Sequence, residues 1–184
     1  TGLTAGWAGA SGRFGVTPDV VSLAKSIGGG FPIGAVGGVD TVMETIHTGA
    51  VHHGTFNGNP LVLAAAKATL EVCSPPALEE AEARSAALAS ELDSVLAGTP
   101  HAISNVGVKG CIAWRDTPVR TYRDWFASDK LLAELAWLWG LNRGVLTPPG
   151  LDEQWLVSLA HDAAACNTYV DVMASLQHHL HHSS

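Results

Sequence analysis

The chain has 184 residues, 47% of them hydrophobic and 15% charged, so it can bury a core, and a disordered chain is excluded. Its net charge of -7 comes without a basic stripe, which argues against nucleic acid or an anionic membrane surface as a partner. The three cysteines, Cys73, Cys111 and Cys166, are far apart and odd in number, which favours free thiols in a reducing cytoplasm over disulfides or a metal site.

The first third of the chain is rich in glycine and alternates short apolar runs with turns. The run over residues 20–24 predicts a buried strand, and Lys25 follows it directly, ahead of a run of glycines. Residues 33–38 predict a second strand, and residues 40–48 predict a helix. Residues 52–60, HHGTFNGNP, have the composition of turns, and their final proline can begin a helix.

Beyond residue 60 the chain alternates helical and strand patterns. Helices are expected over residues 61–73, 77–97, 122–142 and 162–176. Strands are expected within residues 103–114 and at residues 145–146 and 155–160. No apolar run reaches the ~18 residues that a membrane helix needs. Turn residues at 98–100 mark a boundary, so we expect one domain over residues 1–97 and another over residues 98–184.

Lys25 is a candidate catalytic residue because of its place in this pattern. It lies at the C-terminal end of an expected strand, where open α/β sheets place their ligands. Partial burial of its ammonium there would favour the neutral amine, which is the nucleophile of Schiff-base lysines. The glycines that follow allow backbone conformations that other residues avoid. From spacing alone, an ordinary solvated lysine beside a flexible loop remains the alternative.

Two segments of the sequence resemble a known family. Residues 15–38, GVTPDVVSLAKSIGGGFPIGAVGG, closely resemble the cofactor-lysine segment of the class-III aminotransferases, and within that family they are most similar to the glutamate-1-semialdehyde 2,1-aminomutase group. Residues 54–60, GTFNGNP, resemble the family's Gly-Thr-x-x-Gly-Asn-Pro segment. The resemblance implies that Lys25 forms a Schiff base with pyridoxal 5'-phosphate (PLP). It also implies that Thr55, with Gly54 beside it, contacts the PLP phosphate of the neighbouring subunit.

The remaining chain is similar to the family in a less specific way. Residues 114–125 and 143–161 resemble stretches of the small domain, and Glu153 falls near a glutamate that lies by the active site in the aminomutases. The surrounding PPGLDEQ departs from the family pattern at that point, so Glu153 is a weaker substrate-side candidate. The resemblance implies an α/β protein of PLP-dependent transferase fold type I. Residues 1–97 would form the C-terminal part of the PLP-binding large domain with its connecting helix, and residues 98–184 the small domain.

The resemblance also implies a function for the enzyme. We expect PLP-dependent transamination of an amino acid or amine, a small-molecule substrate, in a cytoplasmic homodimer whose active site is shared across the interface. Intramolecular amino transfer by an aminomutase is the first alternative, and a non-catalytic remnant that acts in dimerisation is the second. The family's Asp-Glu-Val segment and phosphate loop do not occur in this sequence. We therefore expect this chain to be a fragment that binds PLP poorly and turns over little by itself.

A group of histidines near the end of the chain is the remaining candidate for ligand binding. His178, His179, His181 and His182 lie within residues 177–184. On a continued helix, His178 and His182 would be one turn apart and could bind nickel or zinc. A frayed and solvated tail is the interpretation that we favour, so no metal site is expected.

Overall fold

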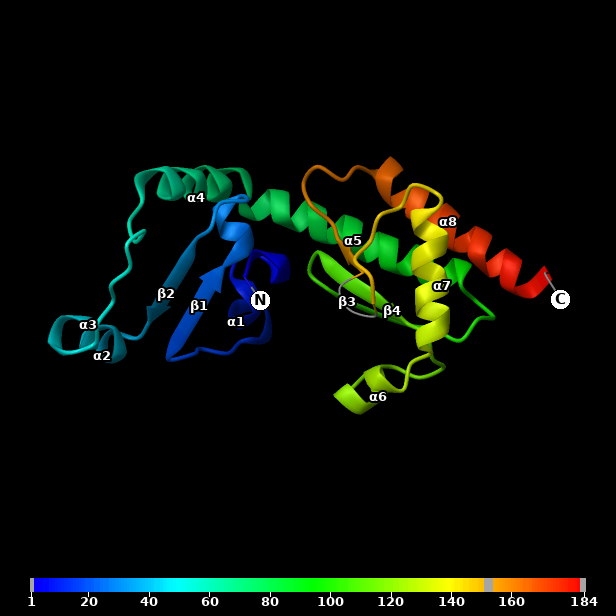
Figure 1. The fold of residues 1–184 in the computed structure, drawn as a ribbon, viewed down its shortest axis with the longest axis horizontal. Helices are drawn as coiled ribbons and strands as arrows, with labels where there is room; N and C mark the ends of the chain where they lie inside the picture. Colours follow the sequence, from blue (N-terminus) through cyan, green and yellow to red (C-terminus); the bar gives the residue numbers. More distant parts are fainter. Residues whose placement is uncertain (1, 151–153, 183–184) are drawn as a thin grey trace. The chain divides into compact units, whose positions relative to one another are not determined.

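The computed structural model describes residues 2–150 and 154–182. These residues form two compact units, Thr1–Leu78 and Glu79–Ser184 (Figure 1). The units meet within a long helix, whereas the boundary expected from the sequence lay at residues 97 and 98. The assignment of residues 1–97 to the large domain and of residues 98–184 to the small domain of the family fold stays a prediction.

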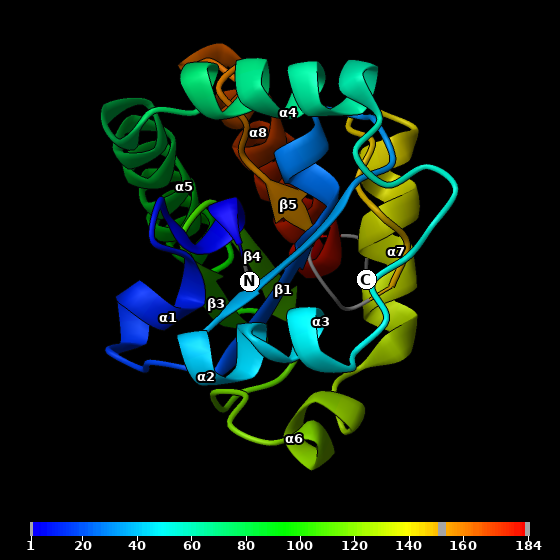
Figure 2. The ribbon, with the colours of Figure 1, turned by 90° about the vertical axis from the view of Figure 1, so that its left-hand side faces the viewer.

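The first unit is built around an antiparallel hairpin. Strand β1 (Val20–Ala24) pairs with strand β2 (Gly34–Gly38), with Val20 opposite Gly38 and Ala24 opposite Gly34. Helix η2 (Lys25–Gly28) lies at one end of the hairpin under helix α4 (Pro60–Val72), and the short helices α2 (Asp40–Met43) and α3 (Thr45–Thr48) lie at the other end (Figure 2). Two further short helices, η1 (Leu3–Ala5) and α1 (Gly9–Phe14), precede the hairpin.

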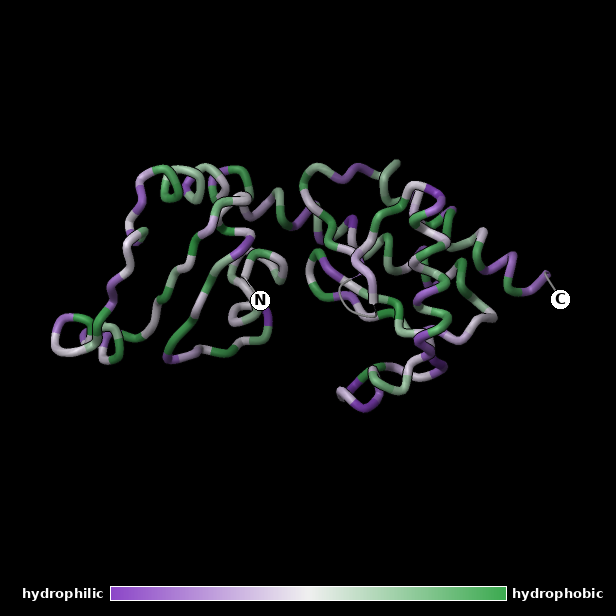
Figure 3. Tube along the Cα trace, in the orientation of Figure 1, coloured by the Kyte–Doolittle hydropathy of each residue, from purple (hydrophilic) through white to green (hydrophobic). Residues whose placement is uncertain are grey.

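The core of the first unit is small. It consists of the buried residues Leu3, Ile27 and Leu78 with the half-buried Leu23, Ile33 and Cys73 packed against them. The expectation that residues 20–24 form a buried strand is therefore wrong in its burial, since β1 alternates exposed and half-buried residues. Helix α4 buries Ala66 and leaves several large apolar side chains exposed, among them Leu61 and Val72. Figure 3 shows these hydrophobic stretches along the hairpin and α4.

The second unit packs a three-stranded antiparallel sheet against helices. Its strands are β3 (Ala102–Val106), β4 (Lys109–Ala113) and β5 (Trp155–Leu156), in the order β3-β4-β5. Its helices are α5 (Pro75–Val95), which begins in the first unit, and α6 (Tyr122–Phe126), α7 (Lys130–Leu141) and α8 (Ala163–His182). Leu88, Leu92 and Leu96 lie at helical spacing and are buried in this core.

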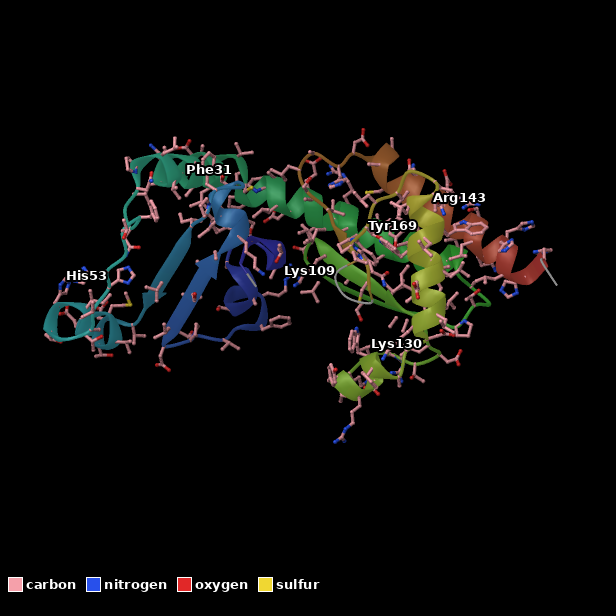
Figure 4. The ribbon with its side chains drawn as sticks, viewed as in Figure 1. Phe31, His53, Lys109, Lys130, Arg143 and Tyr169 are labelled. Atoms are coloured by element: carbon pink, nitrogen blue, oxygen red, sulfur yellow. The ribbon has the colours of Figure 1, made fainter. Side chains whose placement is uncertain are left out.

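Buried polar groups of the second unit differ in their pairing: Gln154 is hydrogen-bonded, whereas Trp125 Nε1 and Ser128 Oγ have no hydrogen-bond partner among the described residues. The buried Gln154 side chain accepts a hydrogen bond from the Ile112 amide at 3.1 Å and donates one to the Ile112 carbonyl at 2.9 Å, so it extends the pairing of β4. Burial raises the pKa of the Tyr169 hydroxyl, which is labelled in Figure 4, and it also raises the pKa of the Cys166 thiol. Both side chains are therefore structural and neutral at physiological pH.

Several expected elements differ from the observed ones. The helix expected over residues 122–142 is two helices, because Asp129 caps the start of α7 with a 2.9 Å hydrogen bond from the Leu132 amide. Residues 145–146 form no strand, and the strand expected over residues 155–160 is limited to β5. Helix α8 continues to His182, so the tail up to that residue is helical rather than frayed.

No single helix in the described ranges is long and apolar enough to cross a membrane, although α4 and α5 would pass that test together as a bent pair.

Candidate functional site

Lys25 has an unusual backbone conformation. It follows the last residue of β1 directly and is the first residue of η2, with φ at 59°. Among the residues that the structure describes, it is the one non-glycine residue with positive φ. A left-handed conformation costs an L-residue roughly 1–2 kcal/mol. Such strain persists only where the surrounding structure imposes it, and it is concentrated at functional sites.

The glycines directly after Lys25 pack closely against neighbouring side chains. A Cβ atom on Gly28 would lie 2.7 Å from Cγ2 of Ile33, and one on Gly29 would collide with the Oγ1 atom of Thr69 on α4. Gly29 also ends η2 in the left-handed conformation. Gly28 and Gly29 therefore form a closely packed turn, whereas nothing lies within 4 Å of a Cβ on Gly30.

The side chain of Lys25 is exposed, as are those of its neighbours Ala24 and Ser26. The expectation that its ammonium is partly buried is wrong for this chain. The physical reason is the small core of the first unit, which covers β1 only through its alternate residues Val21 and Leu23. Access of an external carbonyl compound to the amine is therefore open.

Thr55 and Gly54 lie in a pair of turns before α4. The Asn57 amide donates to the Gly54 carbonyl at 3.0 Å, and the Asn59 amide donates to the Phe56 carbonyl at 3.3 Å. Thr55 is exposed at the middle of the first turn.

Helix α4 begins directly after these turns. The Asn59 side chain accepts hydrogen bonds from the amides of Leu61 at 3.0 Å and Val62 at 3.4 Å, and Pro60 is the first helical residue, as predicted from the sequence. The capped start of α4 therefore fixes one end of the segment that carries Thr55.

The structure places the two main candidates on different segments of the first unit. Lys25 is the first residue of η2, which packs on α4, and Thr55 lies in the loop that also carries His53, which is labelled in Figure 4. Within the described part of the chain, no hydrogen bond or ion pair joins Lys25 to Thr55. Glu153, the weaker substrate-side candidate, lies outside the described residues.

Two features near Lys25 were not found from the sequence. One is Thr69, whose contact with Gly29 fixes the lysine turn and whose hydroxyl donates to the Ala65 carbonyl at 2.8 Å. The other is an apolar hollow of about 390 Å³ along β1, lined by Leu3, Trp7, Val21, Leu23, Ile27 and Leu70. The sequence around Thr69 predicts neither this contact nor the hollow, because both depend on how α4 and β1 pack.

Comparisons with known proteins match the chain to one family. Residues 1–147 match the model of the family "Aminotransferase class-III". The chain is 38% identical over 166 residues to glutamate-1-semialdehyde 2,1-aminomutase 2 of Brevibacillus brevis, an alignment that covers 88% of this chain and 39% of the relative. The chain thus spans about 40% of the length of the curated relatives that it matches.

Solved structures give the same result. An omega-transaminase from Sphaerobacter thermophilus superposes with a TM-score of 0.84 at 27% identity, covering 96% of this chain and 42% of that one. A glutamate-1-semialdehyde aminomutase from Pseudomonas aeruginosa superposes with a TM-score of 0.86 at 26% identity, covering 97% and 43%. The chain therefore belongs to the class-III aminotransferase family, whose members use PLP.

Proposed function

We propose that this chain supplies the cofactor lysine and a phosphate-binding threonine to a PLP-dependent enzyme that transaminates an amino acid or amine substrate. The single observation that carries the proposal is the strained, left-handed backbone of Lys25, which a packed glycine turn holds at the end of β1. When bound, PLP supplies an electron sink for the carbon next to the substrate nitrogen.

Lys25 has two roles in this proposal. Its exposed Nζ would hold the aldehyde carbon of the cofactor covalently, with loss of water. With a substrate amine in its place, the released Nζ of Lys25 would take a proton from the substrate carbon and later return one. Because the same turn holds Lys25 throughout, the amine stays near the reacting atoms after its release.

Thr55 and Gly54 fit a different part of the cofactor. The exposed hydroxyl and the N–H groups of a glycine-containing turn suit the oxygens of a phosphate. From the resemblance of GTFNGNP to the family segment, we assign Thr55 to the cofactor phosphate of the second subunit in a homodimer. Glu153 remains a proposed substrate-side residue.

Intramolecular amino transfer is the second candidate function, and a specific observation favours it. The curated relatives that match at 34% to 38% identity bear the name of glutamate-1-semialdehyde 2,1-aminomutase. We still place transamination first, because the segments GTFNGNP and PPGLDEQ depart from the aminomutase pattern.

A non-catalytic role in dimerisation is the third candidate. The cysteines Cys73, Cys111 and Cys166 form no disulfide with one another in the described residues, and the cytoplasm is the proposed location.

A spectroscopic experiment on the enzyme that contains this chain separates these candidates. A transaminase treated with an amino donor alone should convert its cofactor to the pyridoxamine form and stop until a keto acid is added. A mutase should turn over without a keto acid, and a non-catalytic protein should show no change. Lys25→Ala should abolish turnover, whereas Lys67→Ala is the matched control, because the Lys67 side chain is exposed on α4 and pairs with Glu71 at 3.8 Å. Unchanged turnover of Lys25→Ala would reject the assignment.

A further inference from the structure

The C-terminal helix carries a pair of histidines that the proposed function does not use. Helix α8 remains helical through His182, so His178 and His182 lie one turn apart on its exposed surface. Their ring centroids are 4.2 Å apart, and the ring planes differ by 20°. The helix thus sets two imidazoles side by side before any ligand is present.

This spacing suits one metal ion. Imidazole nitrogens bind Zn²⁺ at about 2.0–2.1 Å, so two of them in a tetrahedral site are about 3.4 Å apart. The rings are stacked nearly parallel with their centroids 4.2 Å apart, so their nitrogen atoms do not converge on one point in this conformation. Both side chains are exposed, and two histidines four residues apart on one helix face can each turn one nitrogen onto a shared ion.

The hydrogen bond of His182 prepares the ring for metal binding. Its Nδ1 lies 2.9 Å from the carbonyl oxygen of His178. A carbonyl oxygen can only accept, so Nδ1 carries the hydrogen and donates it. In the neutral ring, the lone pair is then on Nε2, which is the outer atom. Histidine ligands of metal sites commonly donate their other ring nitrogen in this way.

The other two histidines of this helix end have different contacts. The ring of His179 packs on Trp139 with centroids 4.8 Å apart, and Arg143, which is labelled in Figure 4, covers the same indole at 3.5 Å. The Nε2 atom of His181 lies 3.1 Å from the Thr99 hydroxyl. These two histidines join the end of α8 to the remainder of the second unit, which leaves the pair of His178 and His182 for an external ligand.

We propose that His178 and His182 together bind one divalent ion of the class that prefers imidazole, with water completing its coordination. No group of three or more metal-ligating side chains occurs in the described residues, so the site is a two-histidine chelate and weaker than a closed structural zinc site. The ion would tie the last two turns of α8 together.

The test is a calorimetric titration of the whole chain with Zn²⁺. His178→Ala and His182→Ala should each weaken binding by roughly tenfold or more, because a chelate becomes a single ligand. His179→Ala is the matched control on the same turn and should stay within about twofold of the parent. Mg²⁺ should produce no heat, because it selects oxygen ligands. Unchanged Zn²⁺ affinity in the double variant, or an equal loss in His181→Ala, would overturn the assignment.

A second measurement does not depend on added metal. Nitrogen-15 NMR of the histidine rings in the metal-free chain should show His182 protonated on Nδ1 in its neutral form. A neutral His182 ring protonated on Nε2 would remove the free lone pair and overturn the proposed geometry.

Discussion

Replacing Lys25 by glycine and by alanine separates the chemistry of its amine from the conformation of its backbone. Both variants lose the amine, but alanine keeps the Cβ atom that makes φ at 59° unfavourable, and glycine does not. Relief of the left-handed strain is worth roughly 1–2 kcal/mol, and the greater freedom of glycine in the unfolded chain offsets about 0.5–1 kcal/mol of it. Lys25→Gly should therefore exceed both Lys25→Ala and the parent in free energy of unfolding by about 0.5–1 kcal/mol.

Urea titration followed by circular dichroism measures this difference. With a slope of about 2 kcal/mol per molar urea, the midpoint of Lys25→Gly should rise by roughly 0.3–0.5 M at an unchanged slope. The Lys25→Ala midpoint should stay near that of the parent, because the side chain is exposed. Equal midpoints for the glycine and alanine variants would show that Lys25 carries no backbone strain, and the observation behind the proposed function would fail.

Three further substitutions, one of them a control, test the packing of the first unit and the electrostatics of the second. Gly29→Ala should destabilise the chain by about 2 kcal/mol, because a Cβ there meets the facing helix and φ is 58°, whereas Gly34→Ala should change the unfolding midpoint little, since nothing lies within 4 Å. Equal urea midpoints for these two variants would contradict the packed turn. A hydrogen bond from the Thr121 side chain, together with the Arg120 amide, lowers the pKa of Asp124 from its ordinary 3.8. The carboxylate therefore stabilises the start of α6 fully at pH values above its ordinary pKa. This stabilisation is lost progressively as the pH falls through the lowered pKa of the folded chain. The difference in thermal midpoint between the parent and Asp124→Asn should thus shrink below about pH 4, and a difference that grows in acid would reverse the sign of the argument.

Local signals in the sequence predict many of the elements. The β-rich run before Lys25 predicts β1, and Asn59 with Pro60 predicts the start of α4, because caps and prolines act over a few residues. The break between α6 and α7 was missed although Asp129 is a strong cap, since the apolar period continues across it and outweighed that single residue. The extent of α8 was underestimated because histidine-rich ends were expected to fray.

Burial and backbone strain could not be read from the sequence. Whether an apolar strand is covered depends on which elements pack on it, and β1 is covered only on alternate residues. The glycine run after Lys25 is compatible both with a flexible loop and with a packed turn. The position of Thr69 on the facing helix decides between them. The residues of the candidate site were therefore proposed from a resemblance, while the strain at Lys25 came from the structure.

Reductive trapping of the cofactor tests the central claim most directly. The enzyme that contains this chain is incubated with PLP, reduced with borohydride, digested and mapped by mass spectrometry, with Lys67 as an internal comparison on the same unit. We predict that the phosphopyridoxyl group is found on Lys25, in the peptide that follows β1. A label on Lys67 or on any other lysine, with Lys25 unmodified, would contradict the account.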